Sequence, residues 1–139
     1  RDYRKDWDNI DISKEVKAEH YLDLRKDKLP YDTGTCSEVH CSGVLEQILT
    51  NEDLLHVMNE CHRILKKGGL FNVQVPNAGF ACAHNDPFDC RTFTSQTFKY
   101  FDGSDIYHVN YGSVYGFLPW KILSVNTTDN GIMTVILER

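Results

Sequence analysis

The segment from Leu29 to Asn77 constrains the fold most strongly, because strand, helix and strand signals follow one another directly within it. The letters SEVHCS and, further along, LFNVQV are each typical of a short strand, and a periodic apolar run lies between them. This order predicts a βαβ unit, whose parallel strands and right-handed crossover bring ligands to the carboxyl ends of the strands. Those ends are Cys41-Ser42-Gly43 and Pro76-Asn77.

The helix of this unit has signals at both ends. Thr50 followed by Asp53 is typical of an N-cap residue with an acid at the third helical position. At the other end, Lys66 and Lys67 suit the negative end of the helix dipole, and we expect Gly68 to supply the left-handed C-terminal residue. The apolar positions recur at the spacing of one helix face, namely Leu54, Leu55, Met58, Cys61, Ile64 and Leu65.

Length and charge limit the classes of function. A chain of 139 residues predicts a single domain, 1–139. Its 15 Lys and Arg against 20 Asp and Glu give a net charge of −5, which argues against a broad nucleic-acid or anionic-membrane footprint. The sequence has neither an apolar stretch of membrane-spanning length nor a signal-peptide pattern at its start. We therefore expect a soluble, cytoplasmic protein.

The cysteines indicate no disulfide framework. They are odd in number and form no CxxC pair, and two of them fall at predicted core positions, so we expect reduced thiols. A metal site made of Cys36, His40 and Cys41 is disfavoured, because no second pair of ligands follows. The sequence therefore predicts no metal.

Two alternating stretches end the chain, at 121–126 and 132–137. They are joined by TTDNG, in which Asn130-Gly131 is a strong hairpin signal. We expect an antiparallel final hairpin, which a purely parallel dinucleotide-binding fold does not have.

Five motifs in the same order resemble one known family. LPYDTGTCSEVHCSGVLEQ, followed by ECHRILKKGGLFNVQVPN, is similar to the LPF, CSHVLEH and RVLKPGGLF patterns of compact, type 11-like class I S-adenosylmethionine-dependent methyltransferases. WDNIDIS and HYLDLRKDKLP resemble the second and third strands of that family, and DPFDCRTFTSQTFKYF resembles its DP-x-H-x-R-x-FT segment. The resemblance covers residues 7–101. It implies an α/β fold with a Rossmann-like three-layer sheet, mostly parallel with a C-terminal antiparallel hairpin, and S-adenosylmethionine as the cofactor.

The start of the chain departs from this pattern. In the family, a first strand and a glycine-rich loop come before the second strand. Residues 1–6 are similar to the short link that joins this loop to the second strand. We therefore expect the first strand to be missing. The sequence is either an N-terminally incomplete fragment, which is the commoner case, or that of a protein that has dispensed with the loop. Polar residues alternate along both middle strands, at Glu38 and His40 and at Asn72 and Gln74. This pattern predicts a sheet face that is partly exposed, or covered by a second copy in a homodimer.

The resemblance assigns cofactor-binding roles to the ends of three strands. Asp11, beside Ile12, would accept hydrogen bonds from the ribose hydroxyls, and the alternative is a turn-forming role. The Asp23 carboxylate and the Leu24 amide would meet the adenine, whereas a solvated strand-end acid is the alternative. The sulfonium side would be lined by the backbone of Cys41, Ser42 and Gly43.

Candidate catalytic groups are few, because Gly43 and Gln47 replace both histidines of the family's SHVLEH loop. Glu46 remains as a candidate, and helix capping is its alternative role. Residues 79–119 are expected to form a substrate lid, in which His84 is the candidate base. The same segment supplies the candidate substrate-orienting groups, Asp86 and Arg91.

Two functions follow from these observations. The first is methyl transfer to a small-molecule or glycan acceptor, in which near-attack geometry supplies most of the acceleration and few catalytic side chains are needed. The second is an inactive, methyltransferase-like relic or interaction module that keeps the fold. Aromatic residues are dense between 107 and 120, where they pack in the core or stack on a planar or sugar substrate.

Overall fold

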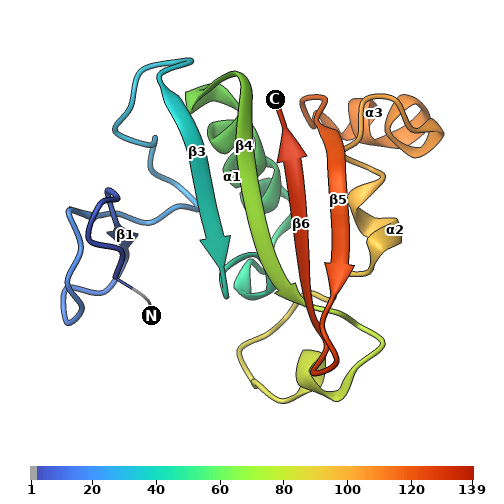
Figure 1. The fold of residues 1–139 in the computed structure, drawn as a ribbon, viewed down its shortest axis with the longest axis horizontal. Helices are drawn as coiled ribbons and strands as arrows, with labels where there is room; N and C mark the ends of the chain where they lie inside the picture. The colour runs from blue at the N-terminus through green and yellow to red at the C-terminus, as the bar shows by residue number, and fades with distance from the viewer. Residues whose placement is uncertain (1–2) are drawn as a thin grey trace.

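A four-stranded sheet lies at the centre of the computed structural model, which describes residues 3–139 (Figure 1). The strand order is β3-β4-β6-β5, where β3 and β4 are parallel and β6 is antiparallel to both of its neighbours. The parallel pair and the C-terminal hairpin are therefore both present, but the central sheet is mixed, with one parallel and two antiparallel pairings, and is not mostly parallel as the resemblance implies. The strands are β3 (Cys36–Ser42), β4 (Leu65–Pro76), β5 (Lys121–Thr127) and β6 (Ile132–Glu138).

The helix α1 (Asn51–Ile64) connects β3 to β4 and begins as predicted. The Thr50 hydroxyl accepts a hydrogen bond from the Asp53 amide at 3.0 Å. The predicted end of α1 at Gly68 is wrong, because the backbone of Leu65 is already extended, and Leu65 is fully buried and paired with Cys36 on β3. Gly68 does have a φ of +76°, but within β4, in the irregular stretch between Leu65 and Leu70, where its amide donates to the Arg139 carbonyl at 2.9 Å.

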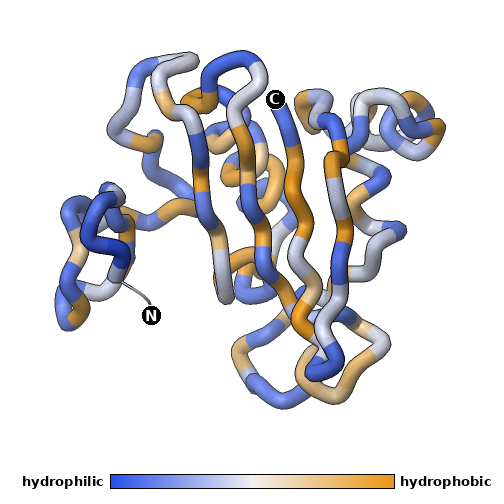
Figure 2. Tube along the Cα trace, viewed as in Figure 1, coloured by the Kyte–Doolittle hydropathy of each residue, from blue (hydrophilic) through white to orange (hydrophobic). Residues whose placement is uncertain are grey.

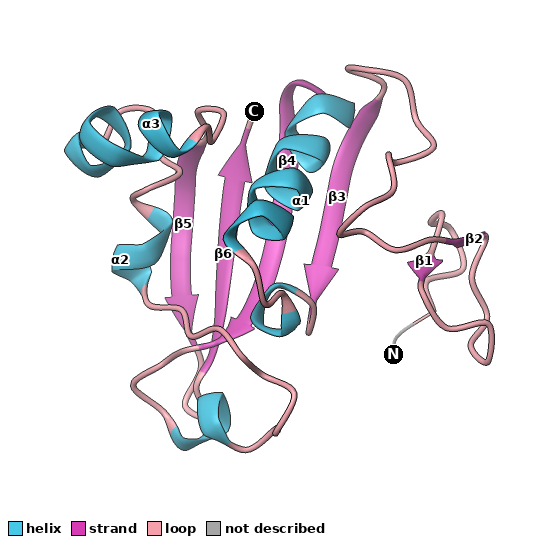
Figure 3. Ribbon diagram, turned by 180° about the vertical axis from the view of Figure 1, so that it is seen from behind, coloured by secondary structure: helices cyan, strands magenta, loops and turns pink. Residues whose placement is uncertain are grey.

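The helices of residues 3–139 cover one face of this sheet and leave the other face without a helix. Seen from behind, α1 lies across β3 and β4, with α2 (Ser95–Phe98) and α3 (Ser113–Tyr115) on the same side (Figure 3). The side chains on this face of β4 and β6 are buried, namely Phe71, Val73, Val75, Met133, Val135 and Leu137. The described residues thus form two layers and not the three layers that the resemblance implies.

The opposite face of the sheet is polar and carries no helix from residues 3–139 (Figure 1). Hydrophilic and hydrophobic residues alternate along β3 and β4 (Figure 2). Glu38, His40 and Gln74 are half-buried on this face, and the buried Asn72 amide donates to Glu38 Oε1. This arrangement agrees with the expectation of a partly exposed face.

The N-terminal strands do not join the central sheet. β1 (Ile10–Asp11) and β2 (His20–Tyr21) pair with each other in parallel as a separate two-stranded sheet. The two predicted strands are therefore present but short. Trp7 connects this part to the main sheet, since its ring packs edge-on against His40 on β3 with centroids 5.2 Å apart.

The predicted lid, 79–119, contains several short helices. They are η2 (Ala81–His84), α2, the π-helix η3 (His108–Gly112) and α3. Outside this segment, a 3₁₀ turn, η1 (Leu45–Gln47), precedes α1. Thr94 caps α2 in a reciprocal capping box with Thr97.

All five cysteines are free thiols. In the described part of the chain, no helix has the length and apolar character to cross a membrane.

A partly buried ion pair anchors the segment before β3 to α1. The Arg63 guanidinium donates to the Glu60 carboxylate at 2.7 and 2.8 Å, and to the carbonyls of Leu29 and Tyr31 at 3.1 and 2.8 Å. Glu60 in turn accepts from the Leu29 amide at 2.9 Å. The hydrogen bond from Arg63 lowers the pKa of Glu60.

Replacing Glu60 with Gln should lower the free energy of unfolding at pH 7 by about 1–3 kcal/mol, because the guanidinium loses its charged acceptor. The folded-state pKa lies below the 4.5 of the unfolded chain, so this stabilisation is present above pH 4.5 and is lost as the pH falls through the folded-state value. Urea unfolding at pH 7 and pH 3 measures both effects. A difference between wild type and variant that does not shrink at pH 3 contradicts the prediction, and the exposed Glu15→Gln serves as control.

Replacing Thr50 with Ala should destabilise the protein by about 1 kcal/mol, because the amide of Asp53 loses its acceptor at the start of α1. The matched control is Thr92→Ala, which removes an exposed hydroxyl outside any helix. Denaturant unfolding of both variants gives the comparison. Equal stability of the two would show that the cap contributes nothing.

Candidate functional site

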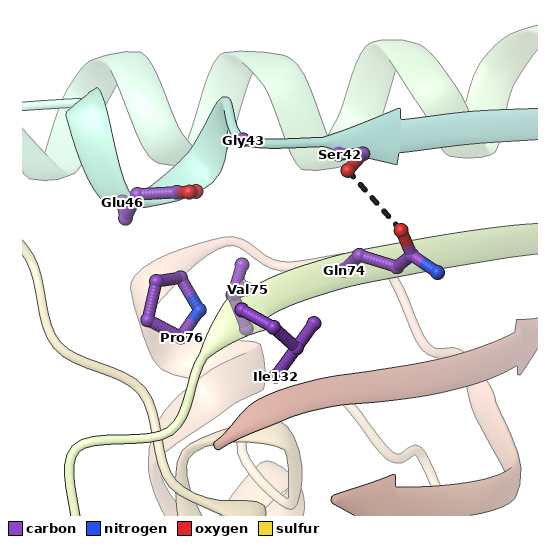
Figure 4. A pocket seen from close by; sticks show the side chains of 7 residues that line it. All are labelled: Ser42, Gly43, Glu46, Gln74, Val75, Pro76 and Ile132. Atoms are coloured by element: carbon purple, nitrogen blue, oxygen red, sulfur yellow. Dashed lines mark hydrogen bonds between the residues drawn. The ribbon is translucent and has the colours of Figure 1, made fainter. Parts of the chain in front are cut away.

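The carboxyl ends of β3 and β4 meet at one edge of the central sheet. Ser42 lies opposite Gln74 in the parallel register, and its hydroxyl donates to Gln74 Oε1 at 3.2 Å (Figure 4). Gly43 follows with a φ of +67°, a conformation that side-chain-bearing residues rarely adopt, and its amide donates to the Gln74 carbonyl at 3.3 Å. The chain therefore turns sharply away from the sheet at Gly43.

A small hollow of about 130 Å³ lies at this edge (Figure 4). It is lined by Ser42, Gly43, Glu46, Gln74, Val75, Pro76 and Ile132. Its volume is below the roughly 300 Å³ at which small-molecule sites begin. It can therefore hold one end of a ligand, while the remainder lies outside it.

Glu46 is the ionisable group of this hollow. It sits in η1 with 5% of its surface exposed, and its Oε2 is buried without a hydrogen-bond partner among residues 3–139. Burial raises the pKa of this carboxyl, and the negative charges of Asp89 and Asp86 act in the same direction. A carboxyl with a raised pKa holds a proton at a higher pH than an exposed carboxyl does, and it can also accept one.

The backbone of Glu46 also fixes the start of the segment that leads to α2. Its carbonyl accepts from the amides of Cys90 and Arg91 at 2.9 and 3.0 Å. The Arg91 guanidinium donates to the carbonyls of Ile48 and Leu49 at 3.1 and 3.3 Å. Arg91 thus binds the connection between η1 and α1 and lies outside the hollow.

The predicted ribose acid, Asp11, ends β1 and is half-buried. Its Oδ1 accepts from the Ser13 amide at 2.7 Å, so the turn-forming role is present. The hydrogen bonds of the described residues leave its Oδ2 unoccupied, and the neighbouring Ile12 is 60% exposed. The ribose-binding role stays a prediction.

The predicted adenine acid, Asp23, pairs with Arg25. The guanidinium donates to both carboxylate oxygens, at 2.7 and 2.8 Å, and this pairing lowers the pKa of Asp23 to about 2. The Leu24 amide makes no hydrogen bond within residues 3–139. An adenine at this position would meet a free amide but a carboxylate that is already engaged.

The structure does not bring the two candidate catalytic residues together. His84 is exposed at the end of η2, which packs near the turn between β5 and β6, and it does not line the hollow that contains Glu46. Asp86 is exposed, with Oδ1 accepting from the Phe88 amide at 2.9 Å. Cys41 is buried, which raises the pKa of its thiol to about 12, so only its backbone is available to a ligand.

Gln74 and Ile132 belong to the hollow but were not predicted as site residues. Gln74 reaches it through the register with Ser42, and Ile132 through the antiparallel pairing with Pro76. The alternating polar pattern on β4 placed Gln74 on the correct face. Assigning it to the site requires knowledge of the strand pairing.

Comparison with known proteins is consistent with this geometry. The family model described as a methyltransferase domain matches residues 6–73, from the N-terminal segment into β4. None of the curated proteins matches the sequence at a significant level.

Solved structures share the fold at low sequence identity. A SAM-dependent methyltransferase from Archaeoglobus fulgidus is 14% identical with a TM-score of 0.64, covering 94% of this chain and 74% of its own. A S-adenosylmethionine-dependent methyltransferase from Clostridium acetobutylicum is 11% identical with a TM-score of 0.62, covering 93% and 73%. A putative methyltransferase from Haloferax volcanii, in complex with the Trm112 methyltransferase activator, is 13% identical with a TM-score of 0.60, covering 93% and 70%.

The family match includes β1, β2, β3, α1 and most of β4, and the structural neighbours extend the likeness over the C-terminal hairpin. The sequence match over residues 6–73 and the fold shared with these structures are therefore consistent with a class I S-adenosylmethionine-dependent methyltransferase, a family whose cofactor is S-adenosylmethionine.

Proposed function

We propose that this chain transfers a methyl group from S-adenosylmethionine to a small-molecule or glycan acceptor at the carboxyl edge of β3 and β4. The observation that carries the proposal is the Glu46 carboxyl, which is buried beside Gly43 with one oxygen that no described protein group occupies. A buried oxygen without a partner is unfavourable for folding, which is expected of a group retained for a ligand.

The residues at this edge fit the cofactor in part. When bound, S-adenosylmethionine supplies an electrophilic methyl group on a positively charged sulfur. The backbone of Cys41, Ser42 and Gly43 would line that side, where the sharp turn at Gly43 leaves room for close approach. The free Oδ2 of Asp11, beside Ile12, would accept hydrogen bonds from the ribose hydroxyls. The Asp23 carboxylate and the Leu24 amide would border the adenine.

We propose that Glu46 accepts the proton that the substrate loses when it receives the methyl group. Its raised pKa makes it a better base than an ordinary carboxylate, and the geometry of the site supplies the remainder of the rate acceleration. Arg91 and Asp86 would orient the acceptor from the lid segment. His84 would take part only if residues 79–119 moved toward the hollow, since it is exposed away from it.

A second candidate function is an inactive relic or interaction module. The small volume of the hollow, about 130 Å³, and the engagement of Asp23 by Arg25 favour it. For either function, we propose the polar face of the central sheet as the surface for a second copy of the chain. Cofactor binding distinguishes the two candidate functions, because methyl transfer requires it and the inactive relic does not.

Titration of S-adenosylhomocysteine into the chain by calorimetry should give a dissociation constant in the micromolar range. Asp11→Ala should weaken binding by at least about tenfold, because a charged acceptor of the ribose hydroxyls is lost. Glu15→Ala, which removes an exposed acid four residues away, should change it less than twofold. No binding at millimolar ligand would contradict the enzyme function and leave the relic.

Glu46→Gln should raise the free energy of unfolding at pH 7 by about 1 kcal/mol, because it replaces a buried ionisable group by a neutral one. The folded-state pKa of Glu46 lies above the 4.5 of the unfolded chain, so its contribution to stability is present below pH 4.5 and is lost as the pH rises toward the folded-state value. The variant's advantage should therefore disappear near pH 4. Urea unfolding between pH 4 and 8 measures it, with the exposed Glu52→Gln as control. A variant less stable than wild type at pH 7 would show that the fold itself uses the carboxylate.

A further inference from the structure

A second, larger cavity lies among the helices. It has a volume of about 520 Å³, which is within the range of small-molecule sites. Its lining includes Leu54 and Leu55 of α1, Arg91, Tyr100, Tyr115 and Phe117. The helices α1, α2 and α3 that carry or flank these residues all lie on the same side of the sheet (Figure 3). Of the residues that line this cavity, the methyl-transfer site proposed above uses only Arg91.

Two of its tyrosines have parallel rings. The planes of Tyr100 and Tyr115 lie within 4° of each other, with centroids 6.5 Å apart. This distance is near the outer end of the 4.5–7 Å range of aromatic pairs, so the two rings gain little from direct contact. Tyr115 is also 57% exposed, although it contributes an aromatic surface to an apolar cavity. Such surfaces favour a flat, aromatic guest.

The cavity also contains an uncompensated positive charge. The Arg91 guanidinium donates to two carbonyls and to Asn51 Oδ1, all of them neutral, and it forms no ion pair within residues 3–139. Guanidinium groups in partly buried positions favour carboxylate or phosphate partners. Glu52, the carboxylate among the lining residues, is exposed in the first turn of α1.

The wall that carries Tyr115 is held in place without a ligand. The Asn59 side chain on α1 donates to the Gly116 carbonyl at 2.9 Å and accepts from the Leu118 amide at 3.0 Å. On the other side, Tyr100 is fixed through its carbonyl, which lies 2.9 Å from His108 Nδ1. The cavity is therefore preformed, which reduces the entropic cost of binding.

We propose that this cavity is a binding site for a planar aromatic acid, whose ring packs on Tyr100 and Tyr115 and whose carboxylate pairs with Arg91. The proposal goes beyond methyl transfer, since it requires neither the cofactor nor Glu46. Arg91, which lines this cavity, donates its backbone amide at 3.0 Å to the carbonyl of Glu46, which lines the smaller hollow.

The test uses 2-naphthoate and its uncharged analogue 2-naphthalenemethanol as probes, titrated by calorimetry without cofactor. Wild type should bind 2-naphthoate saturably at sub-millimolar concentration and at least about tenfold more tightly than the alcohol. Arg91→Gln should bring the two affinities within about twofold. Should Arg91→Gln fail to fold by circular dichroism, the preference in wild type decides the role of the charge. Absence of saturable binding, or equal affinity for acid and alcohol, overturns the proposal.

A matched pair of variants tests the ring site. Tyr115→Ala should weaken 2-naphthoate about fivefold. Tyr111→Ala should change it less than twofold, because Tyr111 is similarly exposed at 47% and neighbours Tyr100 at 6.1 Å, but does not line the cavity. Thermal unfolding of both variants checks that neither loses its fold. Equal weakening by the two substitutions would overturn the assignment of the cavity.

Discussion

The burial of one face of β4 under α1 is the constraint on which the rest of the structure depends. Phe71, Val73 and Val75 are 0–1% exposed, while the residues between them face the other side. Because side chains alternate along a strand, a shift of one residue in register would move Asn72 and Gln74 into the core. The same burial fixes Ser42 beside Gln74 and so creates the carboxyl edge at which the hollow with Glu46 lies.

Features encoded by neighbouring residues were predictable from the sequence. The Thr50 cap and the turn at Asn130-Gly131 both depend on chemistry within a few residues, and both are present. The end of α1 was not predictable in this way, because it is decided by the pairing of Leu65 with Cys36, which lies far away in the sequence. The separation of β1 and β2 from the central sheet likewise depends on packing that no local pattern reports.

The same distinction applies to the candidate site. Ser42, Gly43 and Glu46 lie within five positions of one another, so the loop after one strand was sufficient to select them as candidates, and the structure shows that they line one hollow. His84 was predicted from the resemblance and from its residue type, which do not determine where a long connection folds. Arg91 was expected near a substrate, but its three neutral acceptors and its place in the larger cavity follow only from tertiary structure.

Glu46 shows how the fold retains a buried carboxyl group that is unfavourable for its stability. The side chains on either side of its turn, Leu45 and Ile48, are 0% and 2% exposed, and the amides of Cys90 and Arg91 bind its carbonyl. The backbone at this position is therefore fixed by apolar packing and by hydrogen bonds that do not involve the carboxyl. Since the carboxyl contributes nothing to these contacts, they hold it in place although burial raises its pKa. Such separation of backbone anchoring from side-chain chemistry is what a preorganised proton acceptor requires.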